Sequence, residues 1–330
     1  MKINDVIKKC IKIPGISIKQ AEYSMELILN TKEGKGSMYL FFHFFPVCLW
    51  HIFFINSPTW TAPDLRSDSS ITKGPLLLNY CVTGRCEMIL NNKNFVYIKD
   101  RELSLTECFA QKEYVYPKRI YEGLEFFIDI DTFTLENTWV QNEFSIDFRK
   151  ISKMFCPHGS TYISTATHET EEILKKLWEL YDFPASFAVI QMKIYTLALF
   201  SVLQNLEAIP KSQACTFFTE SQVNIAKKVE NIITSDLRLH HPAWELAEYF
   251  SISETSLKNY FRGVYGQNIS VYLREMRMNK AGELLASTRL SVAEIAAQVG
   301  YLNQSKFASV FKKHFGVSPL EYRRTRHLDS

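Results

Sequence analysis

The sequence of 330 residues predicts an α+β multidomain protein, with a β-rich domain first and an all-α domain last. Three observations predict this fold class. Short runs of aromatic and β-branched residues alternate with turn residues between 38 and 130. Two apolar helical segments follow, and the last third of the chain contains one helical unit twice. The expected boundaries are a β-rich domain at 1–140, a helical region at 141–208, a linker at 209–219 and a helical domain at 220–330.

Composition places the chain among folded globular proteins, because 46% of the residues are hydrophobic and 22% are charged. Residues 220–330 carry 15 Lys and Arg against 11 Asp and Glu, whereas the remainder carries 23 against 24. This local basic excess favours a polyanionic partner. Seven scattered cysteines and no signal-peptide pattern predict a cytoplasmic protein with reduced thiols.

The stretch "MYLFFHFFPVCLWHIFFI", from Met38 to Ile55, contains no charged residue and is long enough to span a membrane. Pro46 divides it, and its aromatic and β-branched residues favour strands. We therefore expect two buried strands and no membrane association. A membrane-anchored regulator that uses 38–55 is the alternative.

Further strands are expected in "LLLNYCV", "CEMIL", "FVYI", "LSL" and "GLEFFIDI". The "TGR" between the first two and the "NNKN" before the third are interpreted as hairpin turns. Cys81 and Cys86 flank the first of these turns, as packing thiols or as a redox or metal-binding pair. Helices are expected at 165–183 and 186–206. The second helix is apolar nearly all round, so it either forms a dimer interface or covers the β-domain.

The duplication in the last third is visible without any other sequence. Leu246 and Ala247 match residues 49 positions later, and after one inserted residue the offset becomes 50, so that Gly266 matches Gly316. Each copy predicts a short helix, a turn and a second helix. Ser253 and Asn303 are expected to cap the second helices, and one continuous helix is expected to join the copies.

A second helix of this kind can enter a DNA major groove. Its outer face in each copy is polar and basic. The candidates for reading bases are Thr255, Lys258, Asn259, Gln304, Ser305, Lys306 and Ser309. The candidates for phosphate contacts are Arg262, Arg274, Lys312 and Lys313.

Residues from about 220 to 326 resemble the DNA-binding domain of the AraC/XylS family of transcription regulators. The resemblance rests on "LAEYFSISETSLKNYFRGVYG", "YLREMRMNKAGELL" and "SVAEIAAQVGYLNQSKFASVFKKHFGVSPLEYR". It implies two helix-turn-helix motifs that enter successive major grooves, preceded by a cupin-like β-barrel sensor. It also implies a small-molecule effector, a homodimer, promoter DNA and RNA polymerase as partners, with activation as the expected role and a nucleoid-associated location. Tyr301 departs from the phenylalanine frequent in the family, and Ala308 and Ser309 are small.

The effector candidates are the polar groups among the aromatic strands, namely His43, His51, Arg85, Glu87 and Tyr116. The sequence contains no glycine-rich phosphate loop, nucleophile elbow or HExxH motif, so we expect no enzyme activity, no catalytic residue, no metal and no cofactor. A cupin-type barrel that binds or converts a ligand, fused to a DNA-binding module, is the second alternative.

Overall fold

A computed structural model of the protein describes residues 15–206 and 217–327 with short gaps. The gaps are 21–23, 32–33, 45–46, 57–58, 62–74, 91–93, 108–112, 132–137, 181–182 and 184. The chain divides into two compact units, Met1–Phe217 and Phe218–Ser330, and each is treated by itself. Most of the expected linker, 209–216, lies outside the described residues.

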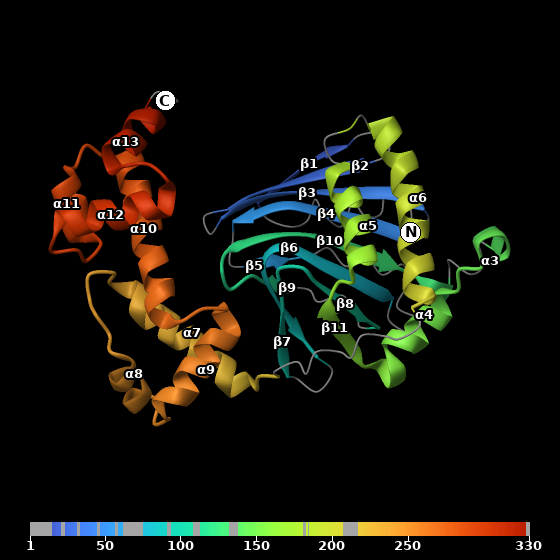
Figure 1. Ribbon diagram of the computed structural model, residues 1–330, viewed down its shortest axis with the longest axis horizontal. Helices are drawn as coiled ribbons and strands as arrows, with labels where there is room; N and C mark the ends of the chain where they lie inside the picture. The colour runs from blue at the N-terminus through green and yellow to red at the C-terminus, as the bar shows by residue number, and fades with distance from the viewer. Residues whose placement is uncertain are drawn as a thin grey trace. The chain divides into compact units, whose positions relative to one another are not determined.

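The first unit is built on a curled antiparallel sheet of 11 strands (Figure 1). The strands are β1 (Ile16–Gln20), β2 (Ser24–Asn30), β3 (Lys35–Phe44), β4 (Val47–Asn56), β5 (Thr59–Thr61), β6 (Leu76–Ile89), β7 (Phe95–Lys99), β8 (Glu102–Thr106), β9 (Glu113–Val115), β10 (Ile120–Ile128) and β11 (Thr161–Thr165). They follow the order β1-β2-β3-β4-β10-β6-β8-β11; β7 and β9 pair with β6, and β5 pairs with β9. The β-rich first domain is confirmed, while closure into a cupin-like barrel stays a prediction.

The apolar stretch from Met38 to Ile55 forms β3 and β4, which pair antiparallel on either side of Pro46. Met38, Leu40, Leu49 and Ile52 are buried. The expectation of two buried strands is therefore confirmed, and a membrane-spanning helix at 38–55 is wrong. Aromatic and β-branched side chains favour the extended backbone here because a sheet can bury both of its faces.

The interpretation of "TGR" as a hairpin turn is wrong, because β6 runs through it without reversing. Gly84 has a φ of 106°, and a Cβ atom there would lie 2.1 Å from the carbonyl oxygen of Ile120. Only glycine accepts this backbone conformation and this approach, so the strand bends at Gly84 and passes on to pair with β7. Strands β6 and β7, on either side of "NNKN", pair antiparallel as a hairpin requires, while residues 91–93 lie outside the described residues.

Helices cover one face of the sheet, as Figure 1 shows for α5 and α6. The helices of this unit are α3 (Thr138–Phe144), α4 (Phe148–Phe155), a 3-10 turn (Pro157–Gly159), α5 (His168–Glu179) and α6 (Ala185–Gln204). The region expected to be helical also contributes β11, which pairs with β8. Buried Tyr162 and Ile163 hold this strand in the core, a tertiary effect that overrides the local helical context.

Helix α6 buries one side and exposes the other. Ala188, Met192 and Leu199 are buried where α6 packs against α4, α5 and β3. By length and composition alone, its segment Ser186–Gln204 is the single stretch among the described helices that could cross a membrane. The helix thus covers the sheet with one face and leaves an apolar face open.

The second unit consists of seven helices among its described residues. They are α7 (Glu220–Ser235), α8 (Ala243–Tyr249), α9 (Glu254–Tyr265), α10 (Ile269–Ser287), α11 (Val292–Gln298), α12 (Gln304–Phe315) and α13 (Pro319–His327). The pairs α8–α9 and α11–α12 have equal helix lengths of 7 and 12 residues. Helix α10 connects the two pairs as the single continuous helix that was expected (Figure 1).

Candidate nucleic-acid interface

The two helix pairs are packed in the same way, which confirms the duplication at the level of side chains. Three aromatic rings meet in each copy. They are Phe261, Tyr265 and Tyr272 in the first copy and Phe311, Phe315 and Tyr322 in the second. The distances between ring centroids, given for the first and second ring, the first and third, and the second and third, are 4.6, 5.5 and 4.9 Å in the first copy. The corresponding distances in the second copy are 4.6, 5.4 and 4.7 Å. Aromatic contacts at these distances stabilise each pair beyond the burial of area.

The ends of the two long helices are fixed by the expected residues. The Ser253 hydroxyl accepts a hydrogen bond from the backbone N–H of Ser256 at 3.1 Å, and the Asn303 side chain accepts from that of Lys306 at 2.8 Å. Gly266 and Gly316 end the helices in the left-handed conformation, with φ of 75° and 79°. The exposed faces of α9 and α12 therefore have a defined register.

All eleven predicted DNA contacts are exposed in the structure. Inward-facing Leu257, Phe261, Phe307 and Phe311 are fully buried, so each long helix presents one apolar and one polar face. Lys258 is ion-paired with Glu254 one turn earlier on α9. Exposed pairs of this kind contribute little to stability, so this pair leaves the ammonium available to a stronger anion.

A cleft of about 900 Å³ lies between the two helix pairs, with α10 as its floor. It brings together three of the predicted DNA contacts: Lys258 from α9, Arg274 from α10 and Lys306 from α12. Its fourth cation is Arg277, and no carboxylate is among its lining residues. Such a cleft concentrates positive potential and favours a polyanion. The other predicted contacts lie on the exposed helix faces outside it.

Sequence reasoning missed several residues of this cleft. His240, His241 and Leu302 line it, and Leu302 is fully exposed. The histidine pair was visible before the first helix of the duplication, but its position beside the cleft depends on packing against α10. An exposed apolar side chain suits contact with a thymine methyl group.

The structure describes the side chains of three of the predicted effector candidates, Arg85, Glu87 and Tyr116. Arg85 lies over the ring of Tyr97 at 5.1 Å, and the Tyr97 hydroxyl donates to Glu87 at 2.6 Å. Tyr116 instead belongs to the interior, where it stacks on Tyr121 at 4.7 Å. The backbones of His43 and His51 belong to β3 and β4, but their side chains lie outside the described residues.

The interior around Tyr116 holds polar groups that the sequence did not single out. The Tyr116 hydroxyl is buried and has no hydrogen-bond partner among the described residues. The Tyr121 hydroxyl donates to Asn79 at 2.7 Å, and that of Tyr114 donates to Glu125 at 2.9 Å. Burial raises the pKa of Glu125 to about 7. Glu125 lies within the apolar run "GLEFFIDI", where a single charged residue has the sequence pattern of an ordinary outward-facing strand residue.

Comparisons with known proteins agree with this geometry. A family model described as a helix-turn-helix domain matches residues 246–325, which span both helix pairs. Transcriptional regulator SirC of Salmonella typhimurium is 32% identical over 128 residues, 38% of this chain and 43% of that protein. The HTH-type transcriptional activator CfaD of Escherichia coli is 30% identical over 176 residues, 52% of this chain and 62% of CfaD.

Among solved structures, the C-terminal domain of AraT, a response regulator from Geobacillus stearothermophilus, shares 37% identity over 31% of this chain and 85% of that chain, with a TM-score of 0.30. The chain spans less than two thirds of the length of the curated relatives that it matches first. The helix-turn-helix match lies within the second unit. The second unit therefore contains a helix-turn-helix domain of the AraC type, similar to the DNA-binding domains of these transcription regulators.

Proposed function

We propose that this protein is a sequence-specific, DNA-binding transcription regulator in which both helix pairs act as helix-turn-helix motifs. The observation that carries the proposal is the cleft between the two equal pairs, which is lined by four cations and no carboxylate. Helices α9 and α12 enter successive major grooves of about 12 Å width, and α10 sets their separation. The molecule is a regulator and not an enzyme, in keeping with the regulators that it resembles.

Bases are read by the exposed residues of α9 and α12, with Lys258 and Lys306 at the edges of the cleft. Lysine can donate to guanine O6 and N7, and threonine, serine, asparagine and glutamine suit the other base edges. Arg262, Arg274, Lys312 and Lys313 contact phosphates, which adds affinity without adding sequence preference. These roles follow from exposure and from position along the two helices.

The first unit senses a small molecule within its curled sheet and passes the signal to the second unit. The buried Tyr116 hydroxyl supports this proposal, because a buried hydroxyl without a hydrogen-bond partner, as found here among the described residues, costs about 1–3 kcal/mol that a ligand can recover. The apolar face of α6, with exposed Phe187, Ile190 and Ile194, supports a homodimer. Activation through RNA polymerase in the cytoplasm is proposed from the activators among the relatives.

The test is the affinity of the full-length protein for the DNA upstream of its own coding sequence, compared with a scrambled duplex over a salt series. We expect selective binding that falls steeply with salt, because lysine and arginine release counterions from phosphates. Lys258→Ala and Lys306→Ala should each weaken specific binding by about 1–3 kcal/mol.

The matched control is Lys280→Ala, because Lys280 is an exposed lysine of α10 that pairs with Glu283 and does not line the cleft. It should leave the affinity unchanged. Equal affinity for both duplexes at every salt concentration, unaltered by either cleft substitution, would contradict the proposal.

A further inference from the structure

One arginine of α10 connects the second helix pair to the segment in front of the first. Arg277 Nε donates a hydrogen bond to the carbonyl oxygen of Leu237 at 2.8 Å, and Nη2 donates to that of Leu239 at 3.0 Å. The same guanidinium lies over the ring of Tyr301, 5.9 Å from its centroid. Leu237 and Leu239 precede α8, whereas Tyr301 follows α11, so this single side chain joins the segment in front of the first copy to the second copy.

A glycine of the second pair closes onto the same place. Gly300 lies in the turn between α11 and α12 with a φ of 81°. A Cβ atom there would lie 2.7 Å from the carbonyl oxygen of Leu237 and 3.0 Å from Arg277 Cζ. The turn of the second copy is therefore in direct contact with the segment that introduces the first copy. Any side chain at position 300 would force these parts away from each other.

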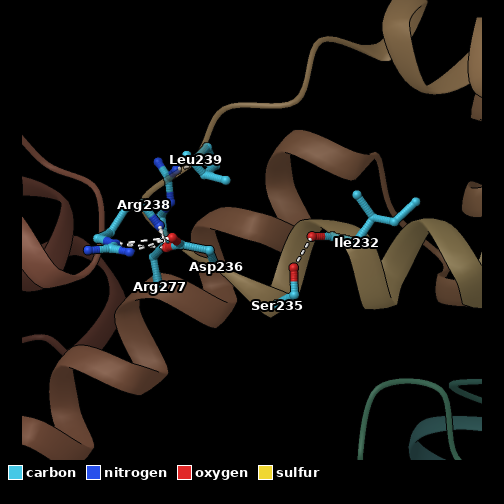
Figure 2. A network of polar contacts seen from close by, with 6 residues as sticks. All are labelled: Ile232, Ser235, Asp236, Arg238, Leu239 and Arg277. Carbon is cyan, nitrogen blue, oxygen red and sulfur yellow. Dashed lines mark hydrogen bonds and ion pairs between the residues drawn. The ribbon is translucent and has the colours of Figure 1, made fainter.

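The segment that receives Arg277 is itself held in a fixed turn. The Asp236 carboxylate accepts hydrogen bonds from the backbone N–H and the guanidinium of Arg238, and the N–H of Leu239 donates to the Asp236 carbonyl oxygen at 3.1 Å. Figure 2 shows Asp236, Arg238 and Leu239 gathered around Arg277. Because these bonds fix the backbone, the two carbonyl groups are presented to Arg277 in a set geometry.

We propose that Arg277 and Gly300 fix the separation and angle between α9 and α12, and that they thereby determine which spacing of two DNA half-sites the protein accepts. This inference rests on the proposed function, in which both helix pairs read DNA. Each base pair inserted between half-sites rotates one of them by about 34° and moves it by about 3.4 Å. Two helices held at a fixed separation cannot follow that change, whereas two loosely joined pairs can.

Arg277 is a positioning residue in this account, although it lines the cleft. Two of its donor groups already bond to backbone carbonyl oxygens, and its planar fork makes both bonds at once. Lysine keeps the charge but lacks this fork. A direct phosphate contact would therefore tolerate lysine, while the positioning role would not.

The experiment uses the full-length protein and a duplex with the two half-sites enriched from a random pool, together with the same duplex carrying one or two extra base pairs between them. Wild-type affinity should fall by about tenfold or more with the insertions, in the range of base-pair mismatches. Arg277→Lys and Gly300→Ala should each reduce this loss to about threefold or less. Melting curves of each variant establish that the DNA-binding unit remains folded.

Arg274→Ala is the matched comparison, because Arg274 lies on the same helix and in the same cleft but is exposed. It should lower affinity for all spacings equally and keep the wild-type preference. The inference is overturned if folded Arg277→Lys and Gly300→Ala proteins keep the full wild-type loss. If the wild-type protein itself shows no loss on insertion, the two pairs are not held at a fixed separation and the inference is overturned as well. Recovery of a single half-site from the random pool would instead contradict the proposed function on which the inference rests.

Discussion

Replacing Glu125 with glutamine should change how the stability of the first unit depends on pH. Glu125 lies on β10 in the interior beside Tyr114, and burial raises its pKa from an ordinary 4.5 to about 7. The folded protein therefore holds a proton on this carboxyl over a range in which the unfolded chain has released it. Stability falls as pH rises from about 4.5 to about 7, and the whole penalty is present above that range.

The size of the effect follows from the two pKa values. Their difference corresponds to about 3 kcal/mol at most, since each pH unit is about 1.4 kcal/mol and the side chain keeps some accessible surface. Glutamine is neutral at every pH, and its oxygen can still accept the hydrogen bond from Tyr114. The variant should exceed the wild type by only about 1 kcal/mol near pH 5 and by up to about 3 kcal/mol near pH 8.

The assay is thermal unfolding of the full-length protein between pH 5 and pH 8, followed through the β-sheet signal. For a unit of this size the gain at pH 8 corresponds to a rise in Tm of about 6–12 °C. Glu179→Gln is the control, because it changes an exposed residue at the end of α5 and leaves Glu125 in place; it should show no such gain over the wild type at pH 8. A Glu125→Gln protein that is less stable than the wild type by the same amount at every pH would refute the reasoning.

Three further predictions concern the DNA-binding unit. Phe261→Ala and Phe311→Ala should each destabilise this unit by about 3–5 kcal/mol in urea unfolding, because both rings are fully buried at equivalent positions; a near-neutral result for either contradicts their equivalence. Ser291→Ala removes a capping box at the start of α11 and should cost about 1 kcal/mol in the same measurement, and an unchanged midpoint would disprove the role of the cap. Arg262→Ala and Lys312→Ala should each lower the slope of log affinity against log salt by about 1 and leave sequence preference unchanged; a changed preference would make them base contacts.

The second unit was predictable because its signals are local. The caps and the glycines at the helix ends concern residues within one or two turns of each other, and the 50-residue offset repeats the same local signals in a second copy. The structure shows equal helices at these places. The outward faces of α9 and α12 followed from helical period alone.

The first unit was predictable only as a set of strands. Strand β10 lies between β4 and β6, which are far from it in sequence, and no local pattern specifies this pairing. The tripeptide "TGR" was interpreted as a hairpin turn because a glycine between polar residues occurs both in hairpin turns and at bends within one continuous strand. Arg277 and Glu125 were missed for a similar reason: the partners of Arg277 are 38 and 40 residues away, and the pKa of Glu125 depends on burial by the whole sheet.

The central claim is that both helix pairs read DNA, and selection of bound duplexes from a random pool tests it most directly. Wild-type protein should enrich two motifs with centres about one helical turn apart, roughly 10 base pairs. Lys258→Ala should erase the sequence preference of one motif and Lys306→Ala that of the other, while Lys280→Ala should keep both. Enrichment of a single motif, or loss of the same motif in both cleft variants, would contradict the account.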